Sequence, residues 1–454
     1  MLFRRILLLA FLFAAVIGFP PAHTQTTTTD ITFARGDGTT TTGTVHAPPG
    51  ATGRPGVVLV HGSGDGTGKQ FDLVAKALAD VGVVALRYTK RTEDYTPMHR
   101  DYSLLADDAL AALAALRARP EVDPSMVGIW GLSEGGWVAP LAASRSAEAA
   151  FLITIAANSR PPATQQAWAN ETWLAAAGVR GSMKDALAHN ALRQLVAAGQ
   201  FAQADYDPIP VLAAIRQPVL AIWGDKDRLT PPGDSLREFQ ATFDRVGKTN
   251  YTLRTLPDAQ HGGHPTTDGF DKLPGLAPGY AELMGEWITG LPATAAGPSV
   301  DEPAVQERSV RALEPTAWWE STGVQLALLF GVVLAFGGYV VTGLVRTWRL
   351  STPLPGRILV CTTLIAIAGT IVQLGSLLTN RAMSFGPLLF GRTLPWLALQ
   401  ATALAALVAL GFVLARARPV LAGASTGARV RWAVLVGGGT GFVLWALYWG
   451  LLLP

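Results

Sequence analysis

The sequence predicts an α/β fold with a doubly wound, mostly parallel sheet, followed by an all-α membrane region. Three observations support this prediction. Between residues 30 and 295, short apolar runs of strand type alternate with helix-like runs. One of these strands is joined to a helix by a serine between glycines, in Gly131-Leu132-Ser133-Glu134-Gly135. Long apolar runs then fill residues 321–454.

The predicted strands and helices alternate along residues 30–291. Strands are expected at 30–33, 43–47, 55–60, 81–88, 126–130, 151–156, 218–224 and 251–256, and helices at 71–79, 102–117, 137–143 and 280–291. The first two strands flank the Gly36-Asp37-Gly38 turn and predict an antiparallel hairpin. The run at 55–60 is continuously apolar, as is typical of a strand that is covered on both faces.

The glycines around Ser133 point to a sharp strand-to-helix turn. Bulkier side chains at 131 and 135 would collide with the neighbouring strand and helix, and the turn lifts the hydroxyl out of the sheet as an exposed nucleophile. Glycine and serine are also common turn residues, so a plain turn is the alternative interpretation.

A second glycine-rich loop, residues 61–68, follows the central strand at 55–60. A phosphate-binding loop would need glycine at position 63 and serine or threonine at position 70, where Ser63 and Gln70 stand. None of Gly62, Gly64 and Gly66 begins a G-x-G-x-x-G set either. Two interpretations remain: a loop whose backbone N–H groups hold a developing oxyanion, or a flexible turn.

A serine nucleophile needs a histidine base, and the base needs an acid that orients it. In this architecture the chain order is serine, acid, histidine. After the strand at 218–224, Asp225 and Asp227 compete for the acid position. Three histidines follow the serine: His189 lies in an alanine-rich helical stretch, whereas His261 and His264 follow the strand at 251–256. His261 is followed by two glycines and is preferred over His264.

At these positions the sequence resembles the α/β-hydrolases of the bacterial secreted serine esterase and dienelactone-hydrolase-like group. The resemblance covers roughly residues 30 to 295. It rests on His61-Gly62-Ser63-Gly64, Arg87-Tyr88-Thr89-Lys90-Arg91, Arg119-Pro120-Glu121-Val122-Asp123, the serine turn at 131–136, Gly224-Asp225-Lys226-Asp227 and His261-Gly262.

The resemblance implies roles for individual residues. Ser133 would be the nucleophile, Asp227 the acid and His261 the general base. The oxyanion donors would be the backbone N–H of Glu134 and that of Ser63 or Gly62. Dienelactone hydrolases use a cysteine nucleophile where this chain has serine, so the resemblance implies a carboxylesterase or related acyl hydrolase that acts on a small-molecule ester or acyl substrate. Such a reaction requires no metal and no organic cofactor.

Residues 157–216 form an insertion that is longer than a normal strand-to-strand connection. Its helix-like segments carry large apolar residues, namely Trp168, Trp173, Leu174, Leu192 and Leu195. These residues predict either a helical cap over the serine that favours apolar acyl groups, or ordinary packing.

The N-terminus has the pattern of a secretory signal peptide over residues 1–25. Arg4-Arg5 precede an apolar run at 6–19, and Ala22-His23-Thr24 offers a weak cleavage site, so an uncleaved anchor is the alternative. We therefore expect residues 26–295 to form an exported hydrolase domain. Residues 296–320 are interpreted as a linker.

Residues 321–454 predict a transmembrane domain of four helices, at 323–345, 358–378, 394–415 and 432–452. All charges in this region are arginines, and seven of the nine lie in the loops after the first and third helices. Because positive loops stay inside, the hydrolase domain is expected on the outer side of the bacterial inner (cytoplasmic) membrane. These arginines also explain the basic pI, so the pI gives no reason to expect a nucleic-acid partner. We predict no such partner.

The membrane region lacks acidic residues and histidine, so anchoring is preferred over transport. The single cysteine, Cys361, lies in an apolar run and leaves no basis for disulfides or a zinc–cysteine site. The sequence thus predicts a membrane-anchored serine esterase. The alternatives are a thioesterase, lipase or peptidase with the same three residues, or a non-catalytic binding module.

Overall fold

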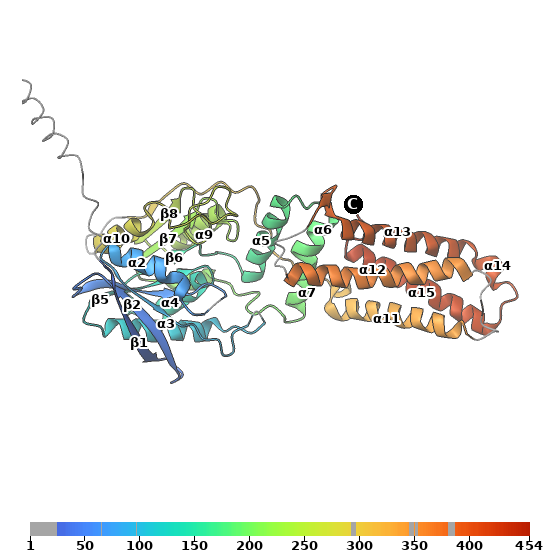
Figure 1. Ribbon diagram of the computed structural model, residues 1–454, viewed down its shortest axis with the longest axis horizontal. Coiled ribbons are helices and arrows are strands. Elements are labelled where there is room, and N and C mark those ends of the chain that lie inside the picture. The colour runs from blue at the N-terminus through green and yellow to red at the C-terminus, as the bar shows by residue number, and fades with distance from the viewer. Residues whose placement is uncertain are drawn as a thin grey trace, which may run out of the picture.

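A computed structural model describes residues 25–64, 66–96, 98–291, 297–344, 349, 353–379 and 386–454. The predicted signal segment therefore lies outside the described residues, apart from Gln25. The molecule is elongated, with the sheet and its helices at one end and a bundle of long helices at the other (Figure 1).

Nine strands of the described chain form one sheet. In spatial order they are β1 (Thr27–Ala34), β2 (Thr40–Ala47), β4 (Val84–Tyr88), β3 (Arg54–Val60), β5 (Val122–Leu132), β6 (Leu152–Ile155), β7 (Val219–Gly224), β8 (Tyr251–Leu256) and β9 (Ser299–Val300). Strand β2 runs antiparallel to both β1 and β4, and the other neighbours pair in parallel. The predicted hairpin and mostly parallel sheet are confirmed.

Helices cover both faces of this sheet because alternate residues of its strands are apolar on both sides. Val58 and Val60 belong to the core on one face, and Val57 and Leu59 to the core on the other. The first face is covered by α3 (Tyr102–Arg117), α4 (Gly135–Arg145) and α9 (Pro232–Arg245), and the second by η1 (Lys69–Phe71), α2 (Asp72–Asp80) and α10 (Tyr280–Gly290).

A helical insertion separates β6 from β7. It consists of α5 (Pro162–Ala176), α6 (Ser182–Asp185), the π-helical turn η2 (Ala186–Asn190), α7 (Ala191–Ala197) and α8 (Ile209–Ala214). Helices α5 to α7 lie between the sheet and the long apolar helices (Figure 1). Leu174 and Met183 of this insertion share one apolar core with Trp396 and Trp445 of the bundle. The insertion therefore connects the two ends of the molecule and packs against the helical bundle.

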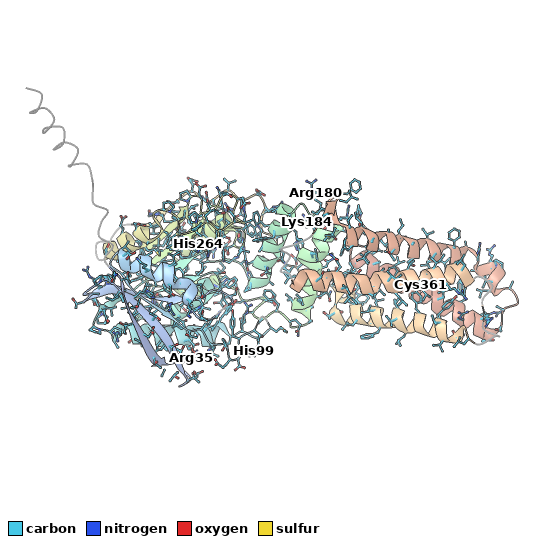
Figure 2. All side chains as sticks on the ribbon, viewed as in Figure 1. Arg35, His99, Arg180, Lys184, His264 and Cys361 are labelled. Atoms are coloured by element: carbon cyan, nitrogen blue, oxygen red, sulfur yellow. The ribbon has the colours of Figure 1, made fainter. Side chains whose placement is uncertain are left out.

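Within the described residues, four helices are long and apolar enough to cross a membrane: α11 (Thr322–Thr342), α12 (Pro353–Thr379), α13 (Leu394–Ala415) and α15 (Thr426–Tyr448). Shorter elements flank them, namely η4 (Trp318–Glu320), β10 (Leu388–Leu389), β11 (Arg392–Thr393) and α14 (Ala417–Leu421). Figure 2 shows Cys361 on the bundle, where it is exposed on α12.

The segment interpreted as a linker makes regular contacts with the sheet domain. It contributes β9 to the edge beside β8, and the backbone N–H of Asp301 donates to the oxygen of Leu253 at 3.0 Å. Farther along, Gln306 Oε1 accepts from the N–H of Asp234 at 2.9 Å. This part of the chain is therefore held against the sheet domain.

Candidate active site

Ser133 stands at the turn between β5 and α4 with a left-handed backbone, φ +58°. The flanking glycines are required by close approach. A Cβ at Gly131 would lie 2.1 Å from the oxygen of Gly135, and a Cβ at Gly135 would lie 2.5 Å from the oxygen of Val60. The turn thus packs directly against its own helix and against the central strand, and the serine occupies a strained position.

Asp227 and His261 are joined by a hydrogen bond. His261 Nδ1 and Asp227 Oδ2 are 2.9 Å apart. The other oxygen, Oδ1, accepts from the backbone N–H groups of Leu229 and Thr230, both at 2.8 Å. The carboxylate is buried, with the residue only 1% exposed. An Nδ1–H that donates to this fixed carboxylate leaves Nε2 of the ring as a proton acceptor.

The competing residues have other partners. Asp225 Oδ1 accepts from the backbone N–H of Ala259 at 3.3 Å. His264, labelled in Figure 2, donates from Nδ1 to the oxygen of Gly275 at 2.6 Å, and its burial lowers its pKa. His189 lies in η2, and its Nε2 is 3.7 Å from Oε2 of Glu171. Among the aspartate and histidine candidates, Asp227 and His261 are therefore the two that the structure brings together.

The sheet order explains how these residues reach one edge. Strands β3, β5, β6, β7 and β8 are consecutive neighbours and run in parallel. The glycine-rich loop follows β3, Ser133 follows β5, Asp227 follows β7 and His261 follows β8. All four segments thus start from the carboxyl edge, where open α/β sheets bind their ligands.

The glycine-rich loop lies against the serine turn. A Cβ built on Gly62 would be 3.4 Å from Cβ of Ser133 and 4.0 Å from its Oγ. Glu134 precedes α4, so its backbone N–H is at the amino end of a helix, where the amides have no intrahelical acceptor. The two segments predicted to supply oxyanion donors are therefore adjacent at Ser133.

A buried charged cluster around Glu134 was not predicted from the sequence. Glu134 is 1% exposed, and its carboxylate accepts from Lys90 Nζ at 2.5 Å, from Tyr95 OH at 2.7 Å and from Arg100 Nη1 at 2.7 Å. Burial lowers the pKa of Lys90, although Glu134 opposes this shift, and burial raises the pKa of Tyr95. The sequence signal for this cluster is Lys90 within the Arg87–Arg91 motif, and the motif by itself indicates no chemical role.

The insertion between β6 and β7 contacts the loops around the site through two side-chain amides, among other contacts. Gln165 of α5 donates from Nε2 to the oxygen of Leu229, beside Asp227. Gln203 donates from Nε2 to the oxygen of Arg100 at 3.0 Å. Among its large apolar residues, Leu174, Leu192 and Trp168 are buried, and Trp168 donates to the oxygen of Arg308. Trp173 instead packs edge-on against Phe270 in the loop that carries His261.

The parallel sheet, the helices on both faces and the strained serine turn define an α/β-hydrolase fold. The long apolar helices follow this domain in the chain. Residues 100–273 match the family model of the Prolyl oligopeptidase family. Esterase EstD of Thermotoga maritima is 29% identical to this chain over 248 residues, covering 48% of this chain and 57% of that esterase. The chain thus spans a little over half the length of this curated relative.

Several solved structures are similar to part of this chain. A dienelactone hydrolase from Anabaena variabilis shares 20% identity with a TM-score of 0.39, covering 58% of this chain and 98% of that one. Esterase Pf2001 of Pyrococcus furiosus shares 18% identity with a TM-score of 0.41, covering 60% of this chain and 96% of that one. The chain therefore contains a domain with the α/β-hydrolase fold.

Proposed function

We propose that the protein is an exported, membrane-anchored serine hydrolase that cleaves carboxylic esters, with Ser133 as nucleophile, His261 as general base and Asp227 as the orienting acid. The observation that carries the proposal is the 2.9 Å contact between His261 Nδ1 and Asp227 Oδ2. It occurs in the chain order that the fold requires, at the edge where the strained serine stands. The EstD likeness supports an ester as the substrate class.

The reaction proceeds in two acyl-transfer steps. Ser133 Oγ attacks the ester carbonyl while Nε2 of His261 takes its proton, and the N–H groups of Glu134 and of Ser63 or Gly62 stabilise the tetrahedral oxyanion. Collapse breaks the bond to the alkoxy group, which leaves with the proton from His261. A water molecule, deprotonated by the same ring, then attacks the acyl-enzyme and releases the carboxylic acid and Ser133.

Labelling with a fluorophosphonate tests this proposal. The detergent-solubilised full chain is treated with the probe, and the modified peptide is mapped. We expect modification at Ser133 that is lost in both Ser133→Ala and His261→Ala. A folded wild-type protein that acquires no label at Ser133 would instead support a non-catalytic binding module.

A peptidase is the second candidate, because the family model that matches residues 100–273 is that of a peptidase family. The same nucleophile, base and acid serve amide hydrolysis, so the leaving group distinguishes the two functions. Matched ester, thioester and amide substrates with one acyl group separate them by kcat/KM. Highest turnover of the amide would replace the esterase assignment.

The contacts of the insertion support an outward-facing hydrolase domain. Asn190 and Gln194 contact the carboxyl end of α15, and Gln194 also bonds to Thr322 at the amino end of α11. The hydrolase domain therefore sits at one end of the bundle. At the opposite end, where Figure 1 shows α14, Arg431 donates to the oxygen of Tyr339, and Arg416 directly precedes α14, which carries Arg418. Since positive loops remain inside, this arrangement supports a hydrolase domain on the outer face of the membrane.

Helix α5 of the insertion also links the candidate site to the bundle. Helix α5 contacts the Asp227 loop through Gln165, and just beyond its other end the N–H of Arg180 donates to the oxygen of Gly391 at 2.9 Å. A helix of 15 residues is about 22 Å long. Helix α5 thus spans the stretch between the Asp227 loop and the loop that precedes α13.

A further inference from the structure

Lys90 connects the two segments that would supply the oxyanion donors. Its Nζ donates to the carbonyl oxygen of Gly62 at 3.0 Å and to Oε1 of Glu134 at 2.5 Å. Gly62 belongs to the loop after β3, and Glu134 directly follows Ser133. A single ammonium group, buried in a residue that is 4% exposed, therefore bridges the loop and the serine turn.

The bond to Gly62 bears on a neighbouring N–H. The carbonyl of Gly62 and the N–H of Ser63 belong to the same planar peptide group, in which they point in opposite directions. Fixing the oxygen of Gly62 therefore fixes the direction of the Ser63 N–H. A cation on the carbonyl oxygen also polarises the peptide group and strengthens its N–H as a donor.

The position of Lys90 is itself tightly fixed. Its Nζ lies 3.7 Å from the centre of the Tyr95 ring, and Tyr95 OH and Arg100 share the Glu134 carboxylate with it. Two cations face one carboxylate, so the cluster is formally positive beside the place where an oxyanion would develop.

The backbone of the loop is held independently of this side chain. The N–H of Lys90 donates to the oxygen of Gly66 at 2.7 Å. Removing the ammonium group therefore leaves the loop attached to the end of β4 while it frees the Gly62–Ser63 peptide to rotate. This separation makes the role of the side chain testable.

We propose that Lys90 is a positioning residue, which orients the Gly62–Ser63 peptide so that the N–H of Ser63, rather than that of Gly62, becomes the second oxyanion donor. This inference rests on the proposed serine hydrolase function. Lys90 does not contact the reacting atoms in this scheme and acts through the peptide group alone.

The test compares Lys90→Met with Lys248→Met in the detergent-solubilised full chain. Methionine keeps the unbranched apolar stem and removes the ammonium group. Lys248 is a matched control, because it also binds two backbone oxygens, those of Ile215 and Gln217, at the opposite edge of the sheet. The measurements are kcat and KM for a p-nitrophenyl ester and the affinity for a trifluoromethyl ketone, which forms a tetrahedral adduct with serine.

We expect Lys90→Met to lower kcat by about ten- to a hundredfold with KM within about twofold, because loss of a whole oxyanion donor costs about a hundredfold or more. The ketone should bind more weakly by a similar factor, and Lys90→Arg should recover part of both losses. Lys248→Met should leave kcat and ketone affinity within about twofold of wild type.

A second comparison separates positioning from the loss of a buried ion pair. In the Glu134→Gln background the ion pair is already absent, so adding Lys90→Met reports on the bond to Gly62. A further fall in kcat and ketone affinity supports the inference. Equal kcat and ketone affinity in Glu134→Gln and in the double variant would overturn the inference. A loss in Lys90→Met that is no larger than the loss in Lys248→Met would overturn it as well.

The wild-type protein distinguishes this inference from the function beneath it. If wild type neither hydrolyses the ester nor reacts with a fluorophosphonate at Ser133, the proposed function is wrong. The role inferred for Lys90 is then wrong as well. If wild type reacts and the Lys90 variants match it, the inference alone is wrong.

Discussion

Asn190 donates a hydrogen bond from Nδ2 to the backbone oxygen of Tyr448 at 2.8 Å, which ties the helical insertion to the carboxyl end of α15. The N–H of Ser182 adds a second tie, to the oxygen of Pro454 at 3.0 Å. Together with the shared apolar core, these bonds make the hydrolase region and the bundle one packed unit.

Arg193 holds the chain that enters the bundle. Its guanidinium donates to the oxygens of Glu314 at 2.9 Å and Pro315 at 2.8 Å, and it pairs with Glu320. We expect Arg193→Ala to speed tryptic cleavage after the exposed Arg311 by about tenfold or more, because a hydrogen bond to a charged group contributes about 1.5–3 kcal/mol. Limited proteolysis followed by mass spectrometry measures this rate.

The control for that experiment is Arg145→Ala. Arg145 makes comparable bonds to Ser103 and Asp107 within the sheet domain. Cleavage after Arg311 should be unchanged in this variant. Equal cleavage rates in wild type and Arg193→Ala would contradict the structural role given to Arg193.

Asp227 and Asp225 are two residues apart but have different partners, so they form a matched pair. Asp227→Asn should lower kcat for an ester by about four orders of magnitude, because an amide stabilises neither the required tautomer of His261 nor its protonated form. Asp225→Asn keeps an acceptor for the N–H of Ala259 and should stay within about twofold of wild type. Steady-state kinetics on both variants measures these changes in kcat. A larger loss of kcat in Asp225→Asn than in Asp227→Asn would assign the role of the acid to Asp225.

The orientation of the hydrolase domain is accessible to cysteine labelling. In a Cys361→Ser background, Lys76→Cys places a thiol on the surface of α2, and Arg418→Cys places one in α14 at the other end of the molecule. We expect a membrane-impermeant maleimide to label the first variant in intact spheroplasts and the second only after lysis. Labelling of Arg418→Cys alone in intact spheroplasts would show that the hydrolase domain faces inward.

Glu171 makes the stability of the insertion sensitive to acid. Burial works against its charge, but Lys184 and Arg311, each at 3.2 Å, and the nearby His189 outweigh burial and hold its pKa below the ordinary value. A lowered carboxyl pKa contributes stability that is present above the unfolded value of about 4.5 and is lost as the pH falls through the folded value.

Glu171→Gln should therefore flatten part of the fall in unfolding temperature as the pH falls below about 4.5. Scanning calorimetry at several pH values measures this fall. Glu286→Gln, an exposed residue of α10, should reproduce the wild-type curve and serves as the control. Identical acid limbs in wild type and Glu171→Gln would exclude the ion-pair cluster as the source.

Much of the architecture follows from local sequence signals. The strands after Pro55, Ser125 and Pro218 are continuous apolar runs, and the order of Ser133, Asp227 and His261 indicates the fold because each follows such a run. Local signals also explain one error of boundary. The strand expected from Val81 begins at Val84, because Gly82 adopts φ +90° where α2 ends.

Other features depend on contacts between distant segments. Strand β9 has two residues and exists because β8 offers an open edge. The cluster around Glu134 draws Lys90, Tyr95 and Arg100 from a connection whose sequence has no regular period. Helix α9 was missed although Pro232 and the spacing of Leu236, Phe239 and Phe243 are typical of an amphipathic helix.

The left-handed backbone of Ser133 lowers the stability of the fold, but it presents the side chain that the proposed reaction needs. A non-glycine residue in the left-handed region costs about 1–2 kcal/mol, a penalty that glycine does not have. Ser133→Gly should therefore unfold at a higher temperature than wild type while it loses the nucleophile. Laboratory evolution that rewards heat resistance without assaying turnover would be drawn to this position, and thermostable variants should be resequenced there first.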